Sequence, residues 1–222
     1  MFHAVSSSSM GTSSKADEFM SQFRRPTGMQ GRAVAALMNR EHDLLTDWGL
    51  SHVKIEPDFT VLDVGCGGGR TIGKLAGYAV EGRVFGIDYS KDMVQYSIEQ
   101  NKQLVVGGRI MVLEGSVEKM SFPNAFFDLV TAVETYYFWS NLPKAFKEIR
   151  RVLKPDGKLL MINEMIKDGN FERENAQTIA KTHVHLHTLP TLQRLLESAG
   201  LTDVETFRKP NSPWNALLTK KT

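Results

Sequence analysis

The sequence predicts an α/β fold built on one mostly parallel sheet, and three observations lead to this prediction. Short apolar runs alternate with segments of helical periodicity between residues 59 and 163. Four glycines within five residues directly follow the first apolar run, which is typical of a turn from a buried strand into a ligand-binding helix. Two further apolar runs near the end of the sequence lie close together, so we expect them to pair antiparallel at one sheet edge.

Seven apolar runs are interpreted as strands, and helices are expected on both faces of their sheet. The expected strands are residues 59–64, 83–88, 110–114, 127–134, 158–163, 204–208 and 214–219. The expected helices are residues 15–23, 33–45, 44–50, 70–78, 91–102, a helix ending at 153, 174–181 and 189–199.

Capping and turn residues support several of these boundaries. Ser90 is a good N-cap for the helix over 91–102. Asn141 and Pro143 open the helix that ends at residue 153, because proline is tolerated in the first helical turn. Residues 155–157, Pro-Asp-Gly, form a turn signal before the fifth strand. Gly200 closes the helix over 189–199.

The chain is expected to contain one nucleotide-binding core with a small addition. Residues 1–14 include a serine run and are interpreted as a disordered leader. Residues 15–57 should form an N-terminal helical cap, and residues 58–222 the core. Within the core, residues 165–188 form a segment that could act as a lid.

Composition narrows the range of partners and locations. The 222 residues include 27 basic and 25 acidic residues without a basic block, so no nucleic-acid partner is expected and a small-molecule acceptor is favoured. The only cysteine, Cys66, cannot form an intramolecular disulfide, which suits a reducing compartment. Neither a membrane-spanning run nor a secretory signal is visible, so we expect no membrane insertion and a cytoplasmic location. The oligomeric state is left open.

The glycine cluster at residues 65–69 does not fit the common phosphate-binding fingerprints. A dinucleotide motif would require glycine or alanine where Arg70 or Ile72 stands, depending on the register. A P-loop would require serine or threonine after Lys74. Asp63, two residues before the first glycine, would repel a pyrophosphate. A cationic or zwitterionic ligand therefore fits better.

The stretch Asp63–Gly69 resembles motif I, Asp-x-Gly-x-Gly-x-Gly, of the class I S-adenosylmethionine-dependent methyltransferases. Residues 86–90, 126–130 and 153–159 resemble further motifs of that family, in the family's order, so the resemblance spans about residues 59–164. It implies a Rossmann-like sheet whose last strand inserts antiparallel beside the fifth, S-adenosyl-L-methionine as cofactor, and methyl transfer to a small acceptor. Within the family, the domain is similar to small-molecule enzymes such as the ubiquinone and menaquinone biosynthesis methylases.

Asp88 is the second anchor of the expected cofactor site. It lies 23 residues after Gly65, near the spacing of a ribose-binding acid, and a carboxylate can accept both ribose hydroxyls. The cofactor-binding residues expected from motif and resemblance are Asp63, Gly65, Cys66, Gly67, Gly69, Asp88, Tyr89, Met93, Ser116, Val117 and Val133.

The acceptor is expected beside residues 133–139, at the end of the fourth strand. Four consecutive aromatic residues at 136–139 exceed what one buried face requires, and an apolar or aromatic acceptor is therefore favoured. The stretch lacks the Asn/Asp-Pro-Pro-Tyr/Phe signature of enzymes that methylate exocyclic amines of nucleic-acid bases. Glu134 and His42 are candidate catalytic residues. Tyr136, Tyr137 and His185 are candidate substrate-binding residues.

Two questions stay open at this level. His183, His185 and His187 alternate as a metal site could require, but no carboxylate lies among them, so no metal is expected. A nicotinamide-dependent oxidoreductase and a non-catalytic S-adenosylmethionine-binding protein are the alternatives to a methyltransferase. The acceptor itself, and whether its oxygen, nitrogen, carbon or sulfur is methylated, do not follow from the residues.

Overall fold

The computed structural model describes residue 22 and residues 26–167, 169, 176, 179 and 184–222. The predicted leader over 1–14 lies outside these residues, as do His183 and nearly all of the predicted helices over 15–23 and 174–181. Every structural statement below concerns the described residues.

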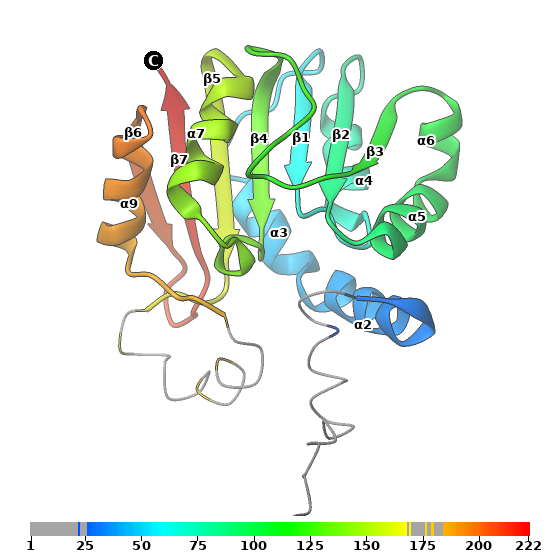
Figure 1. Cartoon of the computed structure of the whole chain (residues 1–222), viewed down its shortest axis with the longest axis horizontal. Coiled ribbons are helices and arrows are strands. Elements are labelled where there is room, and N and C mark those ends of the chain that lie inside the picture. Colours follow the sequence, from blue (N-terminus) through cyan, green and yellow to red (C-terminus); the bar gives the residue numbers. More distant parts are fainter. Residues whose placement is uncertain (1–21, 23–25, 168, 170–175, 177–178, 180–183) are drawn as a thin grey trace, which may run out of the picture.

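The described strands form one sheet in the order β3-β2-β1-β4-β5-β7-β6 (Figure 1). The strands are β1 (Thr60–Val64), β2 (Arg83–Asp88), β3 (Ile110–Glu114), β4 (Phe127–Val133), β5 (Leu153–Asn163), β6 (Leu201–Arg208) and β7 (Asn215–Lys221). β7 runs antiparallel to both β5 and β6, and the pairs from β3 to β5 are parallel. The predicted α/β fold, with a mostly parallel seven-stranded sheet and an antiparallel last strand, is confirmed.

Helices cover both faces of this sheet. The described helices are α2 (Gly28–Glu41), α3 (Asp43–Leu50), α4 (Arg70–Tyr78), α5 (Lys91–Gln100), α6 (Lys102–Val106), α7 (Leu142–Val152) and α9 (Leu189–Ser198), with a 3-10 turn η1 (Tyr136–Phe138). α7 and α9 pack on one face, where Phe146 and Leu196 are fully buried. α3 and α4 pack on the other, where Leu45 and Leu75 are buried. This two-sided burial explains why the central strands are nearly continuous apolar runs.

The strand order around β1 defines where a ligand can bind. β1 lies between β2 and β4, so the connections from β1 and from β4 cross to opposite sides of the sheet. A crevice forms at the carboxyl ends of strands at such a switch point. α2 lies below these carboxyl ends (Figure 1), and its residue Arg32 forms an ion pair with Glu99 of α5.

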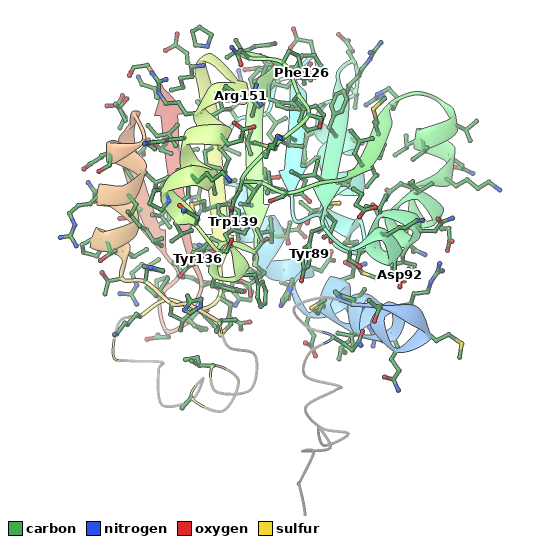
Figure 2. The ribbon with its side chains drawn as sticks, viewed as in Figure 1. Tyr89, Asp92, Phe126, Tyr136, Trp139 and Arg151 are labelled. Carbon is green, nitrogen blue, oxygen red and sulfur yellow. The ribbon has the colours of Figure 1, made fainter. Side chains whose placement is uncertain are left out.

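The opposite end of the sheet, away from this crevice, carries contacts that stabilise the fold. Figure 2 places Phe126 and Arg151 there, far from Tyr89, Tyr136 and Trp139 at the carboxyl ends. Arg151 donates to the carbonyl oxygens of Met120 and Phe122. These contacts hold the segment between β3 and β4 against α7 and leave the carboxyl end for ligand binding.

Two predicted boundaries were wrong in an informative way. A single helix over 33–45 was expected, but α2 ends at Glu41 and α3 begins at Asp43 because His42 adopts φ −86° and ψ 1°, outside the helical range. The apolar periodicity continues through the break, so periodicity could not reveal it. β5 begins at Leu153 and includes the predicted turn, with Asp156 in the left-handed region at φ 59°. None of the described helices has the length and apolar character needed to cross a membrane.

Candidate active site

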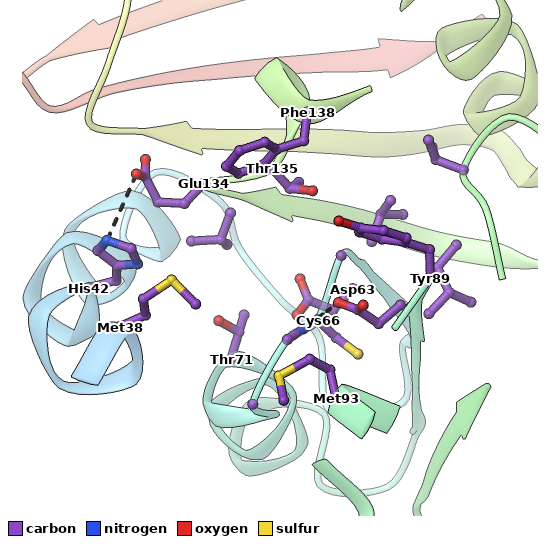
Figure 3. A pocket seen from close by; sticks show the side chains of 18 of the residues that line it. Met38, His42, Asp63, Cys66, Thr71, Tyr89, Met93, Glu134, Thr135 and Phe138 are labelled. Carbon is purple, nitrogen blue, oxygen red and sulfur yellow. Dashed lines mark hydrogen bonds and ion pairs between the residues drawn. The ribbon is translucent and has the colours of Figure 1, made fainter. Parts of the chain in front are cut away.

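A cavity of about 710 Å³ opens at the carboxyl ends of β1, β2 and β4 (Figure 3). Its volume lies within the range of small-molecule sites. Most of the predicted site residues contribute to its wall: His42, Asp63, Gly65, Cys66, Gly67, Asp88, Tyr89, Met93, Ser116, Val117, Val133, Glu134 and Tyr137. These residues come from segments spread over nearly 100 positions of the chain, and the sheet topology brings them together.

The glycine loop between β1 and α4 turns back over the end of β2. The amide nitrogens of Gly65 and Cys66 both donate to the carbonyl oxygen of Ile87, at 2.8 and 3.0 Å. Gly65 has φ 71°, a conformation that side chains rarely adopt. A Cβ atom on Gly65 would also overlap the Thr135 side chain, so the loop and the end of β4 are in close contact.

Asp88, the last residue of β2, is held by the glycine loop and by Ser90, the N-cap of the following helix α5. Its Oδ2 accepts a hydrogen bond from the amide of Gly67 at 2.9 Å, and its Oδ1 accepts one from the amide of Ser90 at 2.8 Å. Burial raises the pKa of this carboxyl, and the two amide bonds act against that effect. Each oxygen keeps a free lone pair with which it could accept a ligand hydroxyl.

Asp63 is a buried carboxyl at the floor of the cavity. Its side chain is nearly inaccessible and accepts a hydrogen bond from Thr131 Oγ1 at 2.6 Å. Burial raises the pKa of Asp63 to about 7, because the charged form loses its hydration. A ligand cation near this carboxyl would favour the ionised form.

The raised pKa predicts that Asp63 makes stability depend on pH. Aspartate in an unfolded chain titrates near 3.8, so between about pH 4 and pH 7 the folded state holds more protons and stability falls as pH rises. Relative to Asp63→Asn, we expect the wild type to lose up to about 4 kcal/mol over this range. Urea unfolding of both proteins without ligand at several pH values measures the difference. Parallel stability profiles would show that Asp63 ionises normally.

Tyr89, Met93, Ser116 and Val117 form the wall of the cavity beyond Asp88. Figure 3 shows the Tyr89 ring and the Met93 side chain on this side, opposite His42 and Glu134. Met93 is fully buried, whereas Tyr89 is 40% exposed at the rim. A flat apolar group could therefore lie between a rigid inner surface and a ring at the opening.

Glu134 lies at the other end of the cavity, directly after β4. It adopts φ 55°, which is uncommon for a residue with a side chain and marks many functional positions. Its Oε2 accepts a hydrogen bond from the hydroxyl of Tyr137 at 2.6 Å, and its Oε1 accepts one from the amide of Glu164. Burial raises the pKa of Glu134 to about 7.

His42 approaches Glu134 from the break between α2 and α3 (Figure 3). Its Nε2 lies 3.9 Å from Glu134 Oε2, beyond hydrogen-bond distance. Burial lowers the pKa of His42, which favours the neutral imidazole. This end of the cavity therefore combines a neutral ring, a buried carboxyl and the aromatic residues Tyr137 and Phe138.

Comparisons with known proteins agree with this geometry. A family model described as a methyltransferase domain matches residues 62–161. An uncharacterized methyltransferase of Bacillus subtilis, YdaC, is 30% identical over 55% of this chain and 65% of its own length. A phosphoethanolamine N-methyltransferase of Triticum aestivum is 31% identical over 68% of this chain and 29% of its own. The chain thus spans less than two thirds of either relative.

Residues 62–161 are thus similar to a methyltransferase domain, and the relatives that match the chain are named methyltransferases. S-adenosylmethionine is the cofactor of this family, in agreement with the prediction. The fold is also that of a geranyl diphosphate C-methyltransferase from Streptomyces coelicolor, with a TM-score of 0.74, 12% identity, and 95% of this chain and 100% of the other covered. None of these similarities favours a nicotinamide-dependent oxidoreductase.

Three predicted site residues are not part of the cavity wall. A Cβ on Gly69 would meet Ser97 and Asn101, so this glycine permits the approach of α5. Tyr136 is buried in the core, with its hydroxyl 3.4 Å from the carbonyl oxygen of Met165. His185 is exposed, and its amide donates to the carbonyl oxygen of Tyr137.

Several wall residues were not predicted, and they differ in how visible they are in the sequence. Gly68 lies in the glycine cluster, and Phe138 and Trp139 lie in the aromatic run. Glu164 directly follows β5, and residues at the carboxyl ends of parallel strands often bind ligands. Met38 and Asn39 come from α2, and Thr71 comes from the first turn of α4. Nothing in their sequence context distinguishes these three from ordinary helix residues.

Proposed function

We propose that this protein transfers the methyl group of S-adenosylmethionine to a small acceptor with an apolar or aromatic body. The observation that supports this proposal is the continuous cavity. It joins the glycine loop and Asp88 at one end to Glu134, Tyr137 and Phe138 at the other. A cofactor bound at the first end and an acceptor at the second would share one enclosed space.

At the cofactor end, we propose that Asp88 accepts hydrogen bonds from the ribose hydroxyls and that Asp63 faces the cationic portion of the cofactor. Tyr89 and Met93 would flank the adenine, with Ser116 and Val117 at its edge. All six residues line the cavity. Cys66 and Val133 would contribute apolar contacts between the two ends.

The proposed reaction is an in-line displacement. A lone pair of the acceptor forms a bond to the methyl carbon while the carbon–sulfur bond breaks, and its electrons stay on sulfur to give S-adenosylhomocysteine. The sulfonium charge disappears in this step, which favours an apolar, water-poor site. The protein contributes mainly by aligning the two reactants. Val133, Met165 and Val184 supply apolar wall near the acceptor end.

We propose that Glu134 and His42 contact the acceptor, because both line the cavity beyond the cofactor end. An acceptor that carries a proton on its nucleophilic atom would pass it to this pair or to water. The relatives do not identify the acceptor, since phosphoethanolamine and geranyl diphosphate differ in size and in the atom that is methylated. The near-neutral net charge of +2 supports a small molecule over a nucleic acid.

Ligand binding and product formation test this proposal separately. In calorimetry we expect S-adenosylhomocysteine to bind with a Kd at or below about 100 μM and nicotinamide dinucleotides to show no binding, since Asp63 would repel a pyrophosphate. Incubation with methyl-labelled S-adenosylmethionine and a fractionated metabolite extract should then yield a labelled small product.

Two results would contradict the proposal. Binding of nicotinamide dinucleotides in place of S-adenosylhomocysteine would support the oxidoreductase alternative. Tight S-adenosylhomocysteine binding without labelled product from any fraction would support a non-catalytic cofactor-binding protein.

A further inference from the structure

Three side chains that can bind a metal converge at the acceptor end of the cavity. His42 comes from the break between α2 and α3, Glu134 from the end of β4 and Glu164 from the end of β5. One ligand atom from each lies within 4.8 Å of the other two. All three residues line the cavity, so a bound ion would be accessible to a small molecule.

The spacing of these atoms suits a shared ion better than direct pairing. His42 Nε2 and Glu134 Oε2 are 3.9 Å apart, too far for a hydrogen bond. Metal–nitrogen and metal–oxygen bonds of about 2.0–2.2 Å place two ligands of one ion roughly 3 to 4.4 Å apart, depending on the angle. The Glu164 ligand atom lies within 4.8 Å of both of these atoms.

The local charge is not balanced by protein cations. In the part of the chain that the structure describes, no lysine or arginine forms an ion pair with Glu134 or Glu164. Glu41 adds a further negative charge near Glu164. Buried carboxylates in proteins are generally paired or bind metal ions.

The Glu134 carboxylate is already held in place by neighbouring donors. The Tyr137 hydroxyl donates to Glu134 Oε2, and the Glu164 amide donates to Glu134 Oε1. Such outer hydrogen bonds orient the ligands in many metal sites.

We propose that His42, Glu134 and Glu164 bind one divalent transition-metal ion at the acceptor end of the cavity. One imidazole and two carboxylates suit Mn²⁺, Fe²⁺, Co²⁺, Ni²⁺ or Zn²⁺ better than the oxygen-preferring Mg²⁺ or Ca²⁺. Three protein ligands leave further coordination positions open. If the proposed methyl transfer is correct, an oxygen or nitrogen donor of the acceptor would occupy one of them and be held beside the methyl group.

The test measures metal binding without any acceptor. Untagged protein, treated with chelator and then dialysed, is titrated with Co²⁺, and the visible absorption bands of bound Co²⁺ are followed. The bound metal is counted by mass spectrometry of the dialysed protein. We expect one Co²⁺ per chain, displaced by one equivalent of Zn²⁺ and unaffected by a large excess of Mg²⁺.

Variants locate the bound ion. His42→Gln and Glu164→Gln should each weaken Co²⁺ binding at least about 100-fold, since even the loss of an outer hydrogen bond can cost 10- to 100-fold. His187→Gln and Glu197→Gln are matched controls outside the cavity wall and should bind Co²⁺ as the wild type does. S-adenosylhomocysteine calorimetry on every variant confirms folding and keeps this test separate from that of the proposed methyl transfer.

One outcome supports the proposed metal site and two would overturn it. Loss of Co²⁺ binding only in the two cavity variants supports the site. Absence of stoichiometric binding to the wild type would overturn it and would favour a protonated amine of the acceptor as the partner of these carboxylates. Loss of binding in His185→Gln or His187→Gln, with His42→Gln unaffected, would also overturn it by assigning the ion to the neighbouring histidine segment.

Discussion

Replacing Asp88 by asparagine is expected to weaken S-adenosylhomocysteine binding by about 100-fold or more. The Asp88 carboxylate accepts from the Gly67 and Ser90 amides and would also accept from both ribose hydroxyls. Hydrogen bonds to a charged group contribute about 1.5–3 kcal/mol each, and asparagine would place an NH₂ group against one of these donors. Calorimetry on the two proteins measures the change in Kd.

Asp92→Asn is the matched control for this substitution. Asp92 lies four residues further along the chain, also accepts a backbone hydrogen bond, from Gly28 at 2.8 Å, and is absent from the cavity wall. Figure 2 shows it at the end of α5 that faces α2. We expect the affinity of Asp92→Asn for S-adenosylhomocysteine to stay within about threefold of the wild type, because loss of a surface interaction costs well under 1 kcal/mol. Equal losses in both variants would contradict the assigned role of Asp88.

Replacing Gly65 by alanine is expected to destabilise the protein and to disrupt the cofactor end together. Gly65 has φ 71°, which costs about 1–3 kcal/mol for a residue with a side chain. The added Cβ would overlap Thr135 Oγ1 and lie 3.0 Å from Thr135 Cβ, and overpacking of this kind costs about 1–3 kcal/mol more. A fall in Tm of roughly 5–20 °C and a large loss of S-adenosylhomocysteine affinity should follow.

Gly108→Ala separates the backbone penalty of Gly65→Ala from the cost of its overlap with Thr135. Gly108 has φ 72°, almost the same as Gly65, but nothing lies within 4 Å of the position where its Cβ would be. It should therefore show only the conformational penalty, with unchanged ligand affinity. The additional substitution Thr135→Ala should partly restore Gly65→Ala by removing the nearer of the two clashing atoms. If Gly65→Ala behaves like Gly108→Ala, the contact between the glycine loop and Thr135 is not important for binding.

Most of the fold could be predicted because it depends on local patterns. The strands 83–88 and 110–114 and the helix 70–78 were predicted with the bounds that the structure shows. Buried parallel strands are short apolar runs, and their turns are marked by glycine and proline, so both signals lie within a few residues of each other. The error at His42 arose where the apolar pattern continues across a change of backbone direction. The error at Leu153 arose because the polar residues 154–158 resemble a turn but form an irregular part of β5.

The glycine-loop end of the cavity was predictable for a similar reason. Asp63, Gly65 and Asp88 belong to motifs in which spacing along the chain determines the position in space, because each lies at the end of a central strand. The acceptor end was predicted less completely. Tyr136 and Tyr137 are adjacent in sequence, yet the 3-10 turn directs Tyr136 into the core and Tyr137 into the cavity wall.

The linear order of residues was sufficient for the fold class, the family and the cofactor, because strand–turn–helix signals and ordered motifs are encoded over short distances. The grouping of His42, Glu134 and Glu164 required the folded chain. These residues are separated by 92 and 30 positions, and no periodicity relates them. They meet because β4 and β5 are parallel neighbours ending at the same edge, and because the helix break at His42 turns its ring toward that edge.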